Sequence, residues 1–194
     1  MIPIIEKIGS IHNTTIVDGL SVLKSVYKTC KEMISDRGYT DIEETHDLEN
    51  ALEECLPVLR GYKISECIDI YFYNEERVGV KFIRNILESS TELNKIIIVS
   101  LDGPTAFTRK ESEKNNIEFF LFKNLCVNIT RHDIVPKHEL ALEVPWTEKE
   151  LPKIYTNDFI VQYYNFPVNS IVKISRTFGC HEPSVFYRIV CESI

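Results

Sequence analysis

The side chains that most often carry chemistry are few and scattered in this sequence. Of the five histidines in 194 residues, His132 and His138 stand six positions apart and do not share a helical face, as the histidines of an HExxH zinc motif do. Cys180 and His181 are adjacent in a predicted loop, where a thiol–imidazole pair rarely reaches catalytic geometry. There is no Walker loop, GxGxxG or GxSxG elbow. The sequence therefore predicts no catalytic residue, no metal site and no cofactor.

The six cysteines do not suggest a zinc ribbon either, because none are paired as CxxC. Most stand in apolar surroundings, as Cys126 does, and are predicted to be buried free thiols in a reducing compartment. No apolar run approaches the roughly 18 residues that a membrane-spanning helix needs. We therefore expect a soluble intracellular protein without a membrane partner.

Charge is distributed unevenly along the chain. The net charge of −7 argues against a protein that coats nucleic acid. Residues 32–76 hold thirteen acids and three bases, whereas residues 77–114 hold seven bases and five acids. The second stretch could create a local positive field on an acidic protein, or it could be an ordinary solvated face.

Hydrophobic spacing in the first two thirds of the chain predicts helices alternating with strands. The run KIIIVSL is continuous and apolar, as in a strand buried on both faces. The acidic stretch after Gly38 reads as a turn, and Thr105 or Thr108 is a candidate helix cap. The expected helices span 15–37, 47–59, 76–90 and about 105–115, and the expected strands span 67–73, 95–101 and 117–122.

The pattern changes after Arg131, where prolines separate shorter elements. A short helix capped by Asn157 is predicted over 157–164, followed by antiparallel strands at 171–175 and 184–191. The predicted fold is thus mixed α+β, with a small α/β domain over 1–131 and a compact α+β domain over 132–194. On these residues alone the chain is a two-domain interaction protein.

The C-terminal part resembles one protein family closely. NITRHDIVPKHEL begins at Asn128, LPKI at Leu151, NDFIVQYYNFPVNSIVKISR at Asn157 and VFYRIV at Val185. These blocks are similar, in order and nearly all spacings, to the assembly domain of the small subunit shared by eukaryotic and archaeal DNA-dependent RNA polymerases. That subunit is called five in eukaryotes and H in archaea. The family's SETxGRY block is replaced by TFGCHEPSVF, so the chain resembles a divergent, shortened member.

The N-terminal part resembles the jaw domain that the eukaryotic versions carry. MISDRGY at 33–39, RVGVKFIRNIL at 77–87 and IIIVSLDGPT at 96–105 are similar to sequence blocks of that domain. The resemblance implies a non-catalytic subunit, since nucleotide addition belongs to the two largest subunits. It also implies docking on the largest subunit near the omega-like common subunit and other subunits. The jaw domain would lie near downstream duplex DNA.

Two sets of residues follow from this resemblance. The DNA-proximal set would act on phosphates without reading sequence, and a helix starting near Thr105 would add its N–H groups. The expected DNA-proximal residues are Arg109, Lys110, Lys81, Arg84 and Thr105. The expected subunit-interface residues are His138, Glu139, Leu140, Leu151, Pro152, Lys153, Lys173, Arg176 and Arg188.

Two other functions stay open at this point. One is a free-standing transcription regulator or scaffold that reuses this fold. The other is a nuclease built on the α/β domain, against which stands the lack of clustered carboxylates and a lysine at metal-site spacing. The resemblance implies a nuclear protein in a cellular eukaryote, or a virion or cytoplasmic-factory protein in a large DNA virus.

Overall fold

The computed structural model describes residues 16–54, 56–73, 75, 77–89, 94–142, 151–177 and 184–193. The chain divides into two compact units, Met1–Val127 and Asn128–Ile194, which are treated separately below. This division falls four residues before the boundary that the sequence predicts after Arg131. No helix among the described residues is long and apolar enough to cross a membrane.

The first unit begins with a long amphipathic helix, α2, over Ile16–Asp36. Leu23, Val26 and Cys30 are fully buried at helical spacing, so one stripe of α2 faces the core. The helix ends at Gly38, whose φ of 84° lies in the left-handed region that glycine adopts without a Cβ clash. The predicted helix over 15–37 and its glycine stop are confirmed.

A five-stranded sheet forms the centre of the first unit, and its strands lie side by side in chain order. The first three strands pair antiparallel, and the last three pair parallel. The parallel half agrees with the alternation of helices and strands in the sequence. The strands are β1 (Thr40–Glu44), β2 (Pro57–Tyr62), β3 (Cys67–Phe72), β4 (Asn94–Ser100) and β5 (Ile117–Leu121).

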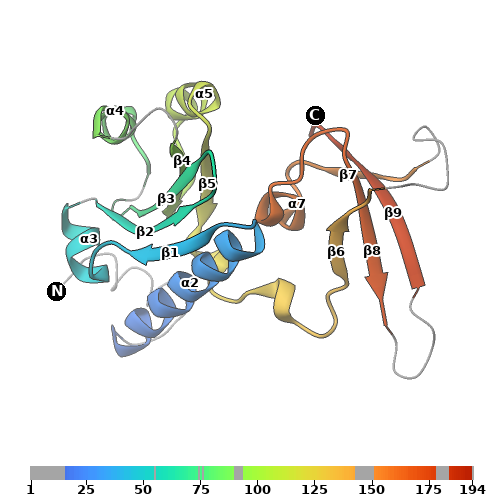
Figure 1. The fold of residues 1–194 in the computed structure, drawn as a ribbon. Coiled ribbons are helices and arrows are strands. Elements are labelled where there is room, and N and C mark those ends of the chain that lie inside the picture. Colours follow the sequence, from blue (N-terminus) through green and yellow to red (C-terminus); the bar gives the residue numbers. More distant parts are fainter. Residues whose placement is uncertain are drawn as a thin grey trace. The chain divides into compact units, whose positions relative to one another are not determined.

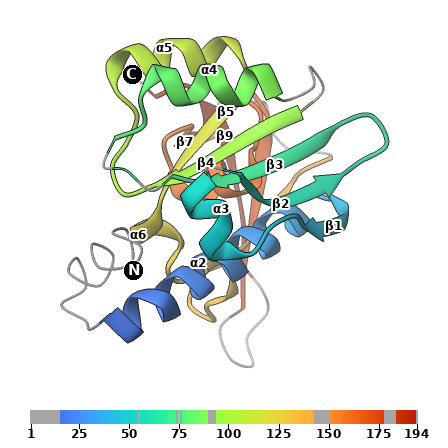
Figure 2. The ribbon, with the colours of Figure 1, turned by 90° about the vertical axis from the view of Figure 1, so that its left-hand side faces the viewer.

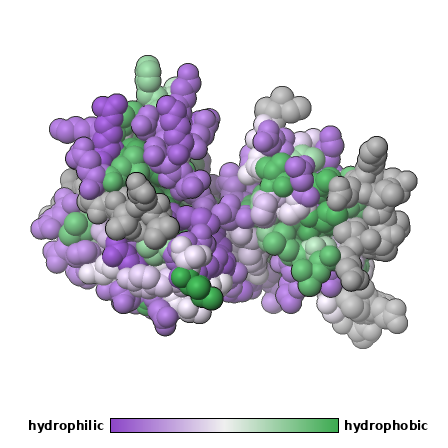
Figure 3. Space-filling view, turned by 45° about the horizontal axis from the view of Figure 1, so that its top comes forward, coloured by the Kyte–Doolittle hydropathy of each residue, from purple (hydrophilic) through white to green (hydrophobic). Residues whose placement is uncertain are grey.

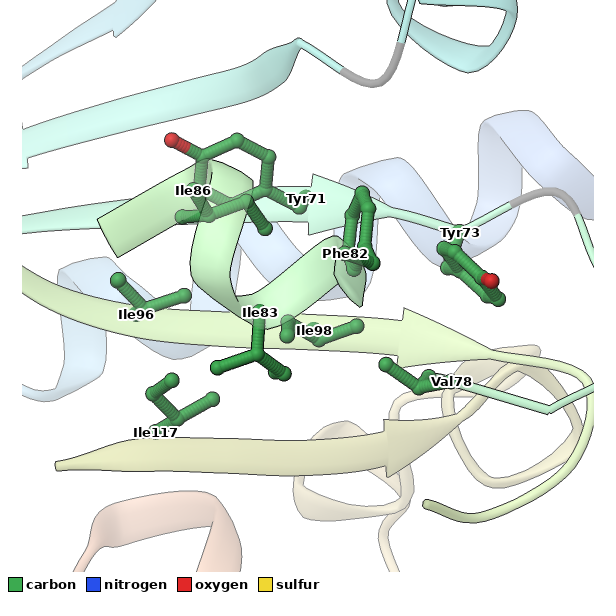
Figure 4. Close-up of a cluster of buried hydrophobic side chains, with 9 residues drawn as sticks. All are labelled: Tyr71, Tyr73, Val78, Phe82, Ile83, Ile86, Ile96, Ile98 and Ile117. Atoms are coloured by element: carbon green, nitrogen blue, oxygen red, sulfur yellow. The ribbon is translucent and has the colours of Figure 1, made fainter. Parts of the chain in front are cut away.

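Helices cover both faces of this sheet. In Figures 1 and 2, α4 (Val80–Ser89) and α5 (Ala106–Lys114) lie side by side over one face, while α2 and α3 (Leu48–Glu54) lie over the other. The short α6 (Phe122–Leu125) follows β5 and contacts α2. Beneath α4, Phe82, Ile83 and Ile86 pack on side chains of β3, β4 and β5 (Figure 4). This packing fixes α4 on the sheet.

The sequence interpretation was wrong over 39–62. The acidic stretch after Gly38 forms β1, and the predicted helix over 47–59 ends at Glu54, before β2 begins at Pro57. The side chains of β1 are mostly exposed, so its strand conformation comes from pairing with β2. Pro57, which has no N–H, stands at the first position of β2, where a strand tolerates it.

The second unit is a four-stranded sheet with one short helix. Its strand order is β6-β8-β9-β7, with β6, β8 and β9 antiparallel and β7 parallel to β9. Apolar side chains of the helix, α7, and of β8 and β9 form a separate core. The elements are η1 (Ile129–Arg131), β6 (Lys137–Leu140), β7 (Lys153–Tyr155), α7 (Phe159–Tyr164), β8 (Ile171–Arg176) and β9 (Ser184–Cys191).

Most of the second unit follows the sequence prediction. The antiparallel pair at 171–175 and 184–191 is confirmed. The helix is capped by Asp158, whose carboxylate accepts from the N–H of Ile160 at 2.8 Å, and not by Asn157. The strands β6 and β7 were not predicted because each is too short to show an alternating pattern. Of the diverged loop at 177–184, residues 178–183 lie outside the described residues.

Candidate interaction surfaces

The motif MISDRGY has a structural explanation inside the first unit. The guanidinium of Arg37 donates two hydrogen bonds to the carboxylate of Glu118 on β5, at 3.1 and 2.7 Å, and is almost fully buried. The hydroxyl of Tyr39 donates to Glu66 at 3.0 Å. Met33 is fully buried. The motif therefore ties the end of α2 to the sheet.

The predicted DNA-proximal cations lie on the two neighbouring helices α4 and α5, which contact each other. All four side chains are exposed, and none makes a hydrogen bond or ion pair with a residue that the structure describes. Together the two helices carry five cations and three carboxylates. We call this set the α4–α5 surface: Lys81 and Arg84 on α4, and Arg109 and Lys110 on α5.

The beginnings of these two helices are joined by hydrogen bonds. Thr105 caps α5, since its hydroxyl accepts from the N–H of Thr108 at 3.3 Å. The hydroxyl of the buried Thr108 donates to the carbonyl of Val78, just before α4, at 2.9 Å. The N–H of Thr105 donates to the same carbonyl. Of the two candidate caps, Thr105 and Thr108, the structure selects Thr105, and the prediction of a helix reaching about Asn115 is confirmed.

The second sheet has two different faces, and the strand register shows which residues share each face. On one face, which we call the helix face, α7 packs on Val172, Ile174 and Val190. Register adds His138 and Leu140 from β6, Arg176 from β8, and Phe186 and Arg188 from β9 to that face. The other face, the open face, carries Glu139, Lys153 and Lys173. The predicted interface residues are therefore split between both faces.

A groove of about 880 Å³ opens on the helix face beside α7. Five of the predicted interface residues line it, together with side chains that sequence reasoning missed, notably Ile174 and Phe186. The signal for Phe186 was available, because strand alternation places it between Ser184 and Arg188 on one face. The predicted residues in the lining are His138, Leu151, Pro152, Arg176 and Arg188.

The groove has a basic character. Burial lowers the pKa of His138 below its ordinary value of 6.5, and the charges of Arg176 and Arg188 lower it further. A hydrogen bond with the Pro136 backbone and the charge of Asp158 oppose this shift. The lowered pKa favours the neutral form of His138 at pH 7, and Asp158, the one carboxylate among the described lining residues, already caps α7.

The open face carries a surface ion-pair network. Lys173 donates to Glu139 at 2.9 Å, and Lys137 lies 3.4 Å from the other oxygen of the same carboxylate. The lysines hold the pKa of Glu139 below its ordinary range, and Glu139 raises the pKa of Lys173. Such solvated pairs add little stability, so this face stays available for other contacts.

Large apolar side chains are exposed mainly on the second unit. Figure 3 shows a hydrophobic area on its visible face. Exposed apolar patches mark interaction sites more often than scattered single residues do. Among the described residues of this unit, the exposed large apolar side chains are Ile129, Ile134, Leu140, Leu142, Tyr155, Val168, Val185 and Phe186.

A hydrogen bond joins two of the sequence blocks that carry the family resemblance, those beginning at Asn128 and at Asn157. The amide nitrogen of Asn128 donates to the hydroxyl of Tyr163 on α7, at 3.0 Å, and its oxygen accepts from Thr130. In a comparison with known families, residues 127–190 match RNA polymerase Rpb5, C-terminal domain. Over these residues the second unit is similar to the Rpb5 C-terminal domain.

Relatives of this Rpb5-like chain match it along most of its length. It is 27% identical to "DNA-directed RNA polymerases I, II, and III subunit rpabc1" of Dictyostelium discoideum, over 89% of this chain and 99% of the relative. It is 27% identical to subunit RPABC1 of Caenorhabditis briggsae, over 85% and 93%. It is 26% identical to DNA-directed RNA polymerase V subunit 5A of Arabidopsis thaliana, over 82% and 83%. The Rpb5-like similarity thus extends beyond the second unit.

Proposed function

We propose that this chain is a non-catalytic structural subunit of a multi-subunit DNA-directed RNA polymerase. The observation that carries the proposal is the match of nearly the whole second unit to the Rpb5 C-terminal domain, together with polymerase-subunit relatives that cover both units. The active site would then belong to the largest subunits. In a cellular eukaryote this role implies a nuclear location, which immunofluorescence with a nuclear marker tests.

The second unit is the proposed docking unit, and its partner is the largest polymerase subunit, close to the omega-like subunit. Its exposed apolar side chains and its groove support this role. A small sheet with one six-residue helix gains stability by covering such surface on a partner.

Affinity purification of the tagged chain from its native source tests the subunit role. The expected result is one copy of the chain per pair of very large subunits, measured by quantitative mass spectrometry. Recovery of the chain alone, or with unrelated proteins, would instead favour a free-standing regulator that reuses the fold.

The first unit is the proposed DNA-proximal unit. The α4–α5 surface supports this role, because its four exposed cations have no partner among the described residues and can approach phosphates. The capped start of α5 adds N–H groups with a partial positive charge on the same helix. Contacts of this kind position duplex DNA without reading its sequence.

The salt dependence of downstream-DNA binding by the assembled enzyme tests this contact. Changing Lys81, Arg84, Arg109 and Lys110 to Gln should reduce the slope of log K against log salt by about one for each phosphate that no longer meets a cation. The control changes four exposed lysines of α2 and α6, on the opposite side of the sheet: Lys24 and Lys123, and Lys28 and Lys31, which pair with Glu32 and Glu44. Equal slopes for both variants and the parent would remove the α4–α5 surface from the proposal.

A further inference from the structure

The groove exists because α7 is too short to cover the sheet beneath it. The helix has six residues and is about 9 Å long, whereas β9 has eight residues and extends about 26 Å. The helix covers Val172 and Val190. It leaves the end of the face that carries Phe186 open to solvent, where this ring is 55% exposed.

Strand register gives the groove a repeating arrangement. Going along β8, the cross-strand pairs on this face are Val172 with Arg188, Ile174 with Phe186, and Arg176 with Ser184. An arginine therefore stands in the first row and in the third row, with two apolar side chains in the row between. The first and third rows are four residues apart, which is about 13 Å along a strand.

The two arginines are available to an incoming carboxylate. Arg176 makes no hydrogen bond or ion pair with any residue in the described parts of the chain. The guanidinium of Arg188 makes one hydrogen bond, to the carbonyl of Lys153 at 3.0 Å, and so keeps other N–H donors. Among the described residues of the lining, Asp158 is the one carboxylate, and it accepts from the N–H of Ile160. The described lining thus has an excess of positive charge around an apolar floor.

We propose that this groove takes an extended segment of another polymerase subunit, with an acidic residue, a large apolar residue two positions later, and a second acidic residue two positions after that. In an extended chain these three side chains point to one side, and the outer two are separated by the same distance as the two arginine rows. The apolar side chain covers the exposed ring of Phe186, next to the buried Ile174, and the carboxylates pair with Arg188 and Arg176. This inference rests on the proposed function and names the chemistry of its docking site.

A protein segment fits this groove better than single-stranded nucleic acid does. Single-strand binding surfaces stack successive bases on several aromatic side chains. Here aliphatic and proline side chains, including Val135, Leu151 and Pro152, line the same groove as Phe186. Nucleic acid is therefore a competing outcome of the test.

Photo-crosslinking in the assembled complex identifies the occupant. A photoreactive phenylalanine at position 186 is compared with the same group at Tyr155, which register places on the open face. The expected product at 186 is a peptide of another polymerase subunit with acidic residues two positions before and two after a large apolar residue. A peptide without this pattern, a second copy of this chain, nucleic acid, or no crosslink from a complex that contains the chain overturns the inference.

Charge reversal gives a second, independent measurement. The double variant Arg176→Glu and Arg188→Glu should dissociate from the polymerase complex at a lower salt concentration than the parent chain does. Its retention in the complex should be at least tenfold weaker. The matched control, Lys24→Glu and Lys123→Glu, changes the same charge on exposed side chains of the first unit. Circular dichroism of both free chains checks that they fold.

The result also separates this inference from the proposed function. Equal retention of the two double variants in the polymerase overturns the groove assignment and leaves the subunit role standing. If the parent chain itself does not co-purify with large polymerase subunits, the proposed function fails and the groove inference fails with it.

Discussion

A buried ion pair joins two strands of the first sheet. Asp69 on β3 is fully buried, and Arg60 on β2 donates to both of its oxygens, at 2.6 and 2.8 Å. This contact raises the pKa of Arg60, chiefly through the hydrogen bonds to Asp69. Burial first, and the charge of Asp69 second, raise the pKa of the neighbouring Tyr71 to about 12. A buried carboxylate of this kind depends on its cation.

Replacing Arg60 by Met should lower the free energy of unfolding by about 3 kcal/mol, because the carboxylate of Asp69 stays buried without its guanidinium. Urea unfolding followed by circular dichroism measures this decrease. The double variant Arg60→Met and Asp69→Leu should recover most of it, whereas Lys24→Met, on an exposed site, should change the free energy by less than about 0.5 kcal/mol. No recovery in the double variant would contradict this explanation.

His138 should make the stability of the second unit depend on pH. Its pKa is lower in the folded chain than the ordinary 6.5, so the unfolded chain binds the proton first as pH falls. The stability that neutral His138 contributes is therefore fully present above about pH 6.5, its ordinary pKa, and is lost as the pH falls below that value. His138→Gln should flatten this decline, as measured by urea unfolding between about pH 5 and 7.5. A steeper decline in the variant would show that the sign is wrong.

At the level of elements, α5 depends on its cap. The helix has nine residues and few buried side chains, so packing alone holds it weakly. Thr105→Ala removes the acceptor for the N–H of Thr108 and should destabilise α5 by about 1 kcal/mol. Hydrogen exchange of the α5 amides should become about fivefold faster. Thr105→Ser keeps the acceptor and should exchange like the parent, and equal exchange in all three chains would exclude the cap as the cause.

The sequence predicts the elements whose pattern is local. Runs rich in aromatic and branched apolar residues marked β3, β4 and β5, helical spacing marked α2 and α4, and a candidate cap marked α5. Elements without a local pattern could not be predicted, and β1 is an example. Thr40–Glu44 is acidic and mostly exposed, and it forms a strand only because it pairs with β2. The predicted helix over 47–59 had the right period and the wrong end, because its last apolar residues, Val58 and Leu59, belong to the sheet core.

The candidate site could be predicted only in part, because its arrangement depends on contacts between segments that are distant in the sequence. Resemblance identified Arg176 and Arg188, but which face each residue takes depends on strand pairing between distant segments. His138 and Glu139 are neighbours in the sequence and point to opposite faces of the second sheet. The groove also depends on the length of α7, and the sequence interpretation started that helix at Asn157, one residue before its cap, Asp158.

For the whole molecule, the two units have separate cores, so their stabilities should be nearly additive. Arg60→Met should speed hydrogen exchange of β3 amides and leave β8 amides unchanged. Val172→Ala, at a fully buried position of β8, should cost about 2 kcal/mol and do the reverse. Exchange mass spectrometry on the two single variants and their combination measures this, and faster exchange in both sheets from either change would show a single cooperative unit.

The strand orders of the two sheets have a consequence for how the chain acquires its structure during synthesis. The first sheet adds each strand next to the one made just before it, so it can grow as the polypeptide leaves the ribosome. The second sheet cannot close in this way, because β9 is its last strand in the chain and lies between β7 and β8. The groove that runs along β9 therefore forms late, when the first unit has already had time to fold.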